Sequence, residues 1–245
     1  MTKELPKLLK DAIKQNRPDV EIITKQLKLP WLKLDIRLPT FIDFWPKYLE
    51  SIKGKDWRQQ WKFENSKSND DYQVKEWNGD LLFGPHPHNK FLETTSNIRY
   101  NVDEDSRCKY YRNDFEFKWY VDENNKIRKW ISWYLPDNDI NLVNTYYIPP
   151  GGYVFPHRDY SFDDMGLAKI YVAAIWGEGN VFGMYGCGDV PIKQGDVFLV
   201  NNYTLPHWVY NGSNDNRVVI DIGANLNSPI IKKLIESSFT KRFSK

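Results

Sequence analysis

A series of short, β-prone runs fills the second half of this 245-residue chain and constrains its fold more than any other feature. Each run is rich in Val, Ile, Tyr, Phe or Trp, and clusters of Gly, Pro and Asn separate neighbouring runs. The runs cover residues 141–148, 149–161, 168–176, 196–202, 207–211 and 217–224. Because no helical periodicity lies between them, the pattern predicts a mainly β protein built as an antiparallel sandwich or barrel.

Helices are predicted on both sides of this β-rich half. An amphipathic pattern near the start predicts a helix that ends before Pro18, and a second short helix is expected over 19–29. The apolar positions of the first helix are Leu5, Leu8, Leu9, Ala12 and Ile13. At the other end, Ser228 and Pro229 are typical of the cap and first turn of a helix. Its predicted apolar stripe consists of Ile230, Ile231, Leu234 and Ile235.

The region between these parts is irregular and rich in Trp, Asn and Pro. Its runs 114–121 and 126–135 are β-prone and flank "DENNK", which is typical of a hairpin. The chain length suits one sizeable core, so a single domain is expected. We expect residues 1–30 to form a helical N-terminal support, 31–139 an irregular or β extension, 140–225 the β core and 226–245 a C-terminal helix.

Composition excludes several classes of partner. The 34 basic and 32 acidic residues leave a net charge of +2, which indicates neither a nucleic acid nor a membrane as partner. The two cysteines cannot build a disulfide framework, and the charged start lacks the apolar core of a signal peptide. A cytoplasmic location is therefore expected. The sequence does not determine an oligomeric state.

The string "PPGGYVFPHRDYS" at 149–161 contains a His-Arg-Asp that two chemistries share. In a protein kinase, an asparagine follows this triplet after four residues, and a Gly-rich loop precedes it. Here Asp164 occupies the asparagine position, the glycine cluster 177–183 follows the triplet, and no Asp-Phe-Gly occurs. The kinase interpretation fails in both content and order.

The alternative is a His-x-Asp metal site. His157 and Asp159 are two residues apart, so on an extended strand their side chains leave from the same face. His207 begins another β-prone run, and a folded-over sheet can bring it opposite the first pair. Two imidazoles and one carboxylate on one side of a metal leave coordination positions open, as in non-haem ferrous oxygenases. These three residues are the predicted metal ligands.

Arg217 lies ten residues after His207, at the start of the next β-prone run. The turn "NGSNDN" between them places both residues on adjacent antiparallel strands. A guanidinium can hold a carboxylate with two parallel hydrogen bonds. A metal beside such a clamp suggests a chelating oxo-acid as ligand.

The segments "PPGGYVFPHRD" and "GDVFLVNNYTLPHWVYNGSNDNRVVIDIG" resemble the aspartyl/asparaginyl β-hydroxylase-type 2-oxoglutarate oxygenases, especially the proline hydroxylases that keep the aspartate. The resemblance covers about residues 140–225. It implies a double-stranded β-helix, a jelly-roll or cupin-like core, with Fe(II) bound by His157, Asp159 and His207. It also implies that Arg217 binds the distal carboxylate of 2-oxoglutarate, with O2 as the other cosubstrate.

The chain departs from this family at one motif. Where the family commonly has Arg-x-His, this sequence has Lys169-Ile170-Tyr171. Because lysine and tyrosine both donate hydrogen bonds to carboxylates, Lys169 and Tyr171 are predicted to take over these cosubstrate contacts. Tyr153, Trp176 and Trp208 are candidates for lining the substrate pocket, with packing in the core as the alternative for each ring.

The resemblance implies a dioxygenase that hydroxylates a C–H bond of an amino acid or a peptidyl side chain and releases succinate and CO2. One rival is a cupin-type metal protein or sensor that does not use 2-oxoglutarate, although such cupins usually carry His-x-His and a later glutamate. Another rival is a barrel that only binds partners, which would be expected to lack a ligand. Substrate selectivity is expected to come mainly from residues 31–130 and the loop 161–166, where no pattern identifies the substrate.

Overall fold

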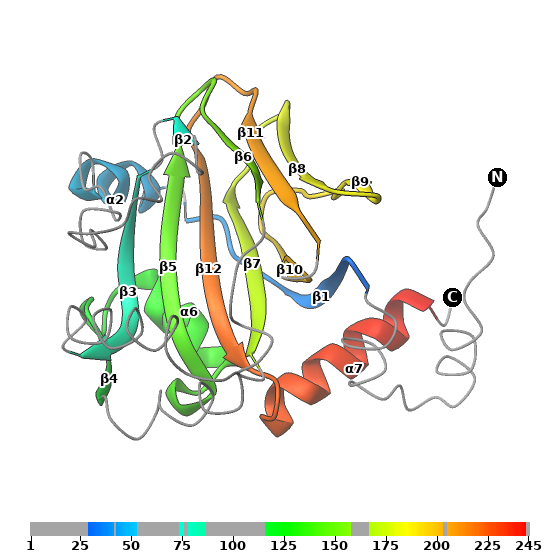
Figure 1. Cartoon of the computed structure of the whole chain (residues 1–245). Coiled ribbons are helices and arrows are strands. Elements are labelled where there is room, and N and C mark those ends of the chain that lie inside the picture. Colours follow the sequence, from blue (N-terminus) through cyan, green and yellow to red (C-terminus); the bar gives the residue numbers. More distant parts are fainter. Residues whose placement is uncertain are drawn as a thin grey trace, which may run out of the picture.

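The computed structural model describes residues 29–41, 43–52, 74–75, 78–86, 116–157, 167–202 and 205–243. Within these residues, twelve strands form two antiparallel sheets and three α-helices lie outside the sheets (Figure 1). The predicted helices before residue 29 lie outside the described residues. The strands are β1 (Trp31–Arg37), β2 (Val74–Lys75), β3 (Asn78–His86), β4 (Glu116–Trp119), β5 (Ile140–Ile148), β6 (Tyr153–His157), β7 (Leu167–Ile175), β8 (Asn180–Met184), β9 (Gly188–Asp189), β10 (Asp196–Val200), β11 (His207–Asn211) and β12 (Arg217–Asn225). The helices are α2 (Trp45–Ile52), α6 (Lys126–Tyr134) and α7 (Pro229–Phe243), with a 3-10 turn, η3, at Asp137–Asp139.

The strand order identifies the fold. The larger sheet runs β1-β10-β7-β12-β5-β3-β4, and the smaller sheet runs β2-β6-β11-β8-β9. From β5 to β12 the chain passes back and forth between the sheets, so that each sheet receives four of these eight strands. Two facing four-stranded sheets wound in this way form a jelly roll, the double-stranded β-helix of the cupins. The predicted mainly β fold is confirmed.

The outer face of the larger sheet packs against the helices. β12 contributes Val218, Ile220, Ile222 and Ala224 to this apolar layer, and each of them is fully buried. The helices contribute Trp45, Ile127, Ile131, Ile235 and Phe239. Because residues two apart on a strand share a face, this layer uses only the even-numbered half of β12.

The helix α6 corrects the hairpin predicted for residues 126–135. Asn125 caps it by accepting hydrogen bonds from the backbone N–H groups of Ile127 and Arg128. Ile127, Trp130 and Ile131 are its buried residues, and their i, i+3, i+4 spacing is that of a helix face. Of the three aromatic residues in this run only Trp130 is buried, whereas Trp133 is 83% exposed, so the aromatic content did not indicate a strand.

The helix α7 begins where it was predicted. The Ser228 hydroxyl accepts hydrogen bonds from the N–H groups of Ile230 and Ile231. The buried stripe consists of Ile231, Ile235, Ser238 and Phe239. Ile230 is 44% exposed, so it does not belong to the stripe as predicted.

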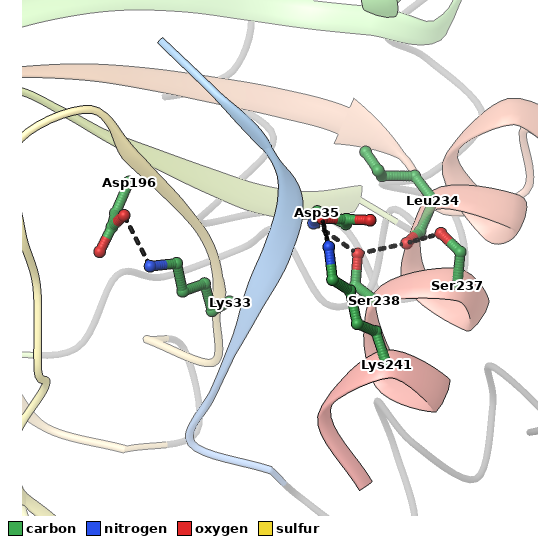
Figure 2. A network of polar contacts seen from close by, with 7 residues as sticks. All are labelled: Lys33, Asp35, Asp196, Leu234, Ser237, Ser238 and Lys241. Atoms are coloured by element: carbon green, nitrogen blue, oxygen red, sulfur yellow. Dashed lines mark hydrogen bonds and ion pairs between the residues drawn. The ribbon is translucent and has the colours of Figure 1, made fainter. Parts of the chain in front are cut away.

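The strand β1 joins α7 to the rest of the molecule (Figure 2). The Ser238 hydroxyl accepts from the backbone N–H of Asp35 at 2.8 Å, and Lys241 pairs with the Asp35 carboxylate at 2.5 Å. On the other side of β1, Lys33 pairs with Asp196 of β10 at 2.7 Å. β1 thereby occupies an edge of the larger sheet and holds the C-terminal helix against it. Among the described helices, none has the length and apolarity to cross a lipid bilayer.

Candidate metal and anion site

The strands β6 and β11 place two predicted metal ligands side by side. They pair antiparallel, and the register sets His157 directly opposite His207. Residues directly opposite in such a pair have Cβ atoms about 4.5–5.5 Å apart and share one face of the sheet. The structure therefore brings together two ligand positions that lie 50 residues apart in the sequence.

The side chain of His207 is described in detail. It is 4% exposed and stacks on the Phe182 ring, with centroids 5.4 Å apart and planes 23° apart. Phe182 in turn lies 4.8 Å from the ring of Tyr171 on the facing sheet. His207 therefore faces the interior between the two sheets. The third predicted ligand, Asp159, lies outside the described residues, and no group of three His, Cys, Asp or Glu side chains close enough for a metal ion occurs within them.

Arg217 is a buried cation at the start of β12. Its side chain points to the same interior, because it shares the face of Val219 in the inner core. The residue is 3% exposed. Its guanidinium lies over the rings of Trp176, at 4.8 Å, and Tyr171, at 5.8 Å. In the described part of the chain it forms no ion pair, and its Nε has no hydrogen-bond partner there.

Tyr171 is the polar neighbour of this guanidinium. Its hydroxyl oxygen accepts a hydrogen bond from Arg217 Nη2. Burial raises the pKa of Tyr171 to about 12, and the adjacent Arg217 charge opposes that rise only in part. Burial also lowers the pKa of Arg217. The tyrosine thus keeps its proton at ordinary pH, and its own O–H can be donated to an anion that binds the guanidinium.

Lys169, a predicted cosubstrate contact, forms an ion pair with Asp221. Its ammonium Nζ lies 2.9 Å from Asp221 Oδ2, and the two side chains are 15% and 8% exposed. Lys169 shares the inner face of β7 with Tyr171, and the register sets Asp221 opposite Tyr171. Asp221 was missed by the sequence analysis. The sequence pattern that could have identified Asp221 is its spacing of four residues from Arg217, which sets both charges on the same face of an otherwise apolar strand.

Three aromatic residues were candidates for a substrate pocket. Trp176 lies against Arg217 and 6.4 Å from the Tyr171 ring, at the interior site. Trp208 alternates with the inward-facing His207 and covers Gly183, where an added Cβ would lie 2.1 Å from the indole. Tyr153 alternates with the buried Val154 in the same way. Strand parity therefore sets Trp208 and Tyr153 on the outer face of the smaller sheet, away from the interior site.

Comparison with known proteins gives distant likenesses. No protein-family model and no curated protein matches the sequence. Among solved structures, a Pseudomonas putida prolyl-4-hydroxylase is 13% identical, covers 90% of this chain and 100% of its own, and has a TM-score of 0.41. A viral collagen prolyl hydroxylase from Paramecium bursaria Chlorella virus-1 is 14% identical over 80% of this chain and 95% of its own, with a TM-score of 0.39.

A third structure is named for an oxidoreductase of the 2OG-Fe(II) oxygenase family from Burkholderia pseudomallei. It is 9% identical, covers 89% of this chain and 90% of its own, and has a TM-score of 0.38. The strand order described above establishes the jelly roll independently of these likenesses.

Proposed function

We propose that this protein is an Fe(II)- and 2-oxoglutarate-dependent dioxygenase that hydroxylates a C–H bond of an amino acid or a peptidyl side chain. The observation that carries the proposal is Arg217, a buried guanidinium that makes no ion pair among the described residues. An unpaired buried charge is strongly unfavourable, so a site of this kind is built for an anion that arrives later. The His157–His207 register pair on the facing sheet supplies the second half of the site.

The anion that fits this end of the interior is a carboxylate. Arg217 can offer two parallel N–H groups, and Tyr171 can add its O–H. The rings of Trp176 and Tyr171 flank the guanidinium and exclude water from it. In this proposal Arg217 and Tyr171 bind the distal carboxylate of 2-oxoglutarate and orient the molecule along the interior. The cosubstrate contact predicted for Lys169 would compete with the Lys169–Asp221 ion pair.

The donor chemistry at the other end fits ferrous iron. His157, Asp159 and His207 would hold the ion, with two imidazoles and one carboxylate as ligands. Bound there, the ion would supply activation of dioxygen, coupled to conversion of 2-oxoglutarate into succinate and carbon dioxide. The Phe182 ring stacked on His207 fixes the plane of the imidazole, and the apolar inner core keeps the interior dry.

The test is binding and turnover of the cosubstrate. Purified protein with Fe(II) and 2-oxoglutarate is expected to form succinate, and calorimetry with Mn(II) in place of iron is expected to show 2-oxoglutarate binding. Arg217→Ala should weaken that binding by about 2 to 5 kcal/mol, because it removes one partner of a buried charge pair. Arg217→Lys should restore only part, since an ammonium lacks the planar fork.

A second arginine offers a matched control. Arg242 lies 3.9 Å from the centroid of the Trp31 ring, on the C-terminal helix and outside the jelly-roll interior. Arg242→Ala removes the same group from a similar aromatic neighbour and should leave 2-oxoglutarate affinity unchanged. If the parent protein binds metal but not 2-oxoglutarate, the proposal is wrong and a cupin-type metal protein is the better description.

A further inference from the structure

Asp221 is the acidic side chain that distinguishes the interior. Of the residues that the structure describes on β5, β7 and β12, it alone is acidic, and it shares the inner face with Arg217 and Val219. It is 6% exposed as a residue. Its neighbours across the strands are Asn144 on one side and Tyr171 on the other. A carboxylate is therefore held beside the tyrosine that serves the anion site.

This carboxylate cannot serve an anionic cosubstrate, because two negative charges in a dry interior repel each other. Lys169 compensates it at 2.9 Å. Stability does not require such a pair, since well-packed apolar residues in place of a buried ion pair are often neutral or stabilising. Stability alone therefore does not account for the buried Asp221 carboxylate.

The position of Asp221 relates it to the metal end of the site. Asn211 donates to the carbonyl of Ile148 at 2.7 Å, and Ile148 pairs with Arg217, so β11 and β12 meet at this level. From there, His207 lies four residues back along β11 and Asp221 lies four residues on along β12. Four residues along either strand is a rise of about 13 Å from that level, at 3.3 Å per residue. The ring of Tyr171, which lies opposite Asp221, is 4.8 Å from the ring of Phe182, and Phe182 stacks on His207, so a group bound to Asp221 would lie between the metal ligands and the anion site.

We infer that Asp221 is a substrate-specificity residue that receives an ammonium group, so that the substrate is an amine, either a free amino acid or a lysyl side chain. This rests on the proposed function, because it assigns the substrate of the same site. The Lys169 contact shows that an alkylammonium fits against the Asp221 carboxylate. A carboxylate has about four acceptor positions, so a second ammonium can bind beside Lys169 or replace it. An uncharged peptide backbone offers no such group.

The test measures binding to protein loaded with Mn(II) and 2-oxoglutarate. The standard free L-amino acids, their Nα-acetyl derivatives and a blocked peptide with one internal lysine are titrated by calorimetry. At least one compound with an ammonium group should bind, and acetylation of that group should weaken it tenfold or more. A free amino acid as the ligand identifies the α-ammonium, whereas the blocked peptide as the ligand identifies the lysyl ammonium.

Variants assign the effect to the carboxylate. Asp221→Asn should lose the same tenfold or more in ammonium affinity, while Asp221→Glu, which retains the charge, should recover part of it. The 2-oxoglutarate affinity of Asp221→Glu, which keeps a carboxylate for Lys169, should stay within about twofold, a difference of about 0.4 kcal/mol. Asp189→Asn, a change at an exposed position on β9, controls for net charge.

Two results would overturn the assignment of Asp221. One is binding of 2-oxoglutarate without binding of any ammonium compound in the panel. The other is equal affinity for a compound and its acetylated form. This comparison needs only the parent protein, so it can be made even if Asp221→Asn does not fold. Failure of the parent to bind 2-oxoglutarate is a separate result, which removes the proposed function itself.

Discussion

Both faces of β12 are buried, but only one of them carries charged side chains. One face presents Val218, Ile220, Ile222 and Ala224 to the helices, and the other presents Arg217, Val219 and Asp221 to the smaller sheet. Residues on both faces are withdrawn from water, yet only the inner face carries charge. The outer face supplies the burial that stabilises the fold, whereas the inner face keeps groups whose desolvation opposes folding.

This difference indicates where substitutions should affect stability and where they should affect binding. β12 buries a guanidinium at Arg217 and a carboxylate four residues later, and burial of these charged groups does not stabilise the fold. The same contrast appears on β7, where Ile170 and Val172 face the helices and Lys169 and Tyr171 face the interior. Each of the following changes affects one face and leaves the other intact.

The largest effect is expected from His207→Ala on β11, which faces the interior from the smaller sheet. Removal of a ligand should lower metal affinity by more than about 100-fold, beyond the 10- to 100-fold typical of outer-shell partners. The fold should survive, because the substitution does not touch the apolar layer under the helices. Metal binding followed by calorimetry with Mn(II) checks this, and Tyr210→Ala, at a position 45% exposed on the same strand, is the control. Unchanged affinity in His207→Ala would remove this residue from the ligand set.

Ile220→Ala tests the outer face. The residue is fully buried in the layer between β12 and the helices, so the cavity should lower the free energy of unfolding by about 2 to 5 kcal/mol. Denaturant unfolding measures this change. The folded fraction should still bind 2-oxoglutarate with parental affinity. A large loss of that affinity would show that the two faces do not act separately.

Tyr171→Phe on the inner face should have the opposite profile. It removes only the hydroxyl next to Arg217, which should weaken 2-oxoglutarate binding by about 1.5 to 3 kcal/mol, the range for hydrogen bonds to charged groups. The thermal midpoint should change little, because the ring and its contact with Phe182 remain. Parental affinity in the variant would leave Tyr171 as a packing residue.

The smallest effect concerns alkaline pH. The folded-state pKa of Tyr171 is about 12, and an unperturbed tyrosine titrates near 10, so the unfolded chain releases this proton first. The stability linked to this proton is fully present below pH 10 and is lost as the pH rises toward 12. At pH 11 the loss is about 1.4 kcal/mol. Tyr171→Phe should remove this part of the slope, and identical slopes in both proteins would contradict the shifted pKa.

The strands of the jelly roll could largely be predicted from sequence, because alternation and turn residues act locally. The runs 141–148, 168–176, 207–211 and 217–224 all correspond to strands. β8 was not identified, because glycines flank its two adjacent large apolar residues, Val181 and Phe182, within a few residues, and the Trp208 indole occupies the space over Gly183. That constraint comes from another strand and leaves no local pattern. The hairpin predicted for residues 126–135 was wrong because aromatic and β-branched residues favour strands locally, whereas here Ile127, Trp130 and Ile131 form one buried helix face.

The candidate site shows the same limit. His207 and Arg217 were singled out by their order along the chain, and the register and burial are consistent with that choice. The partner of Lys169 could not be predicted, because the Asp221 contact depends on how β7 and β12 align across the sheet. Alternation along a strand assigns Tyr153 and Trp208 to the outer face of the smaller sheet. The sequence alone could not make this assignment, because it does not show which neighbour on each strand faces inward.

The contacts between β1 and α7 have a consequence for how the chain folds. They join positions 203, 206 and 211 residues apart, far longer separations than the tight turns between β11 and β12 or β7 and β8. Closing so long a loop is entropically unfavourable until the intervening strands have condensed. Docking of α7 on β1 is therefore a late event on the folding pathway, and during synthesis it must wait until residues 229–243 have left the ribosome.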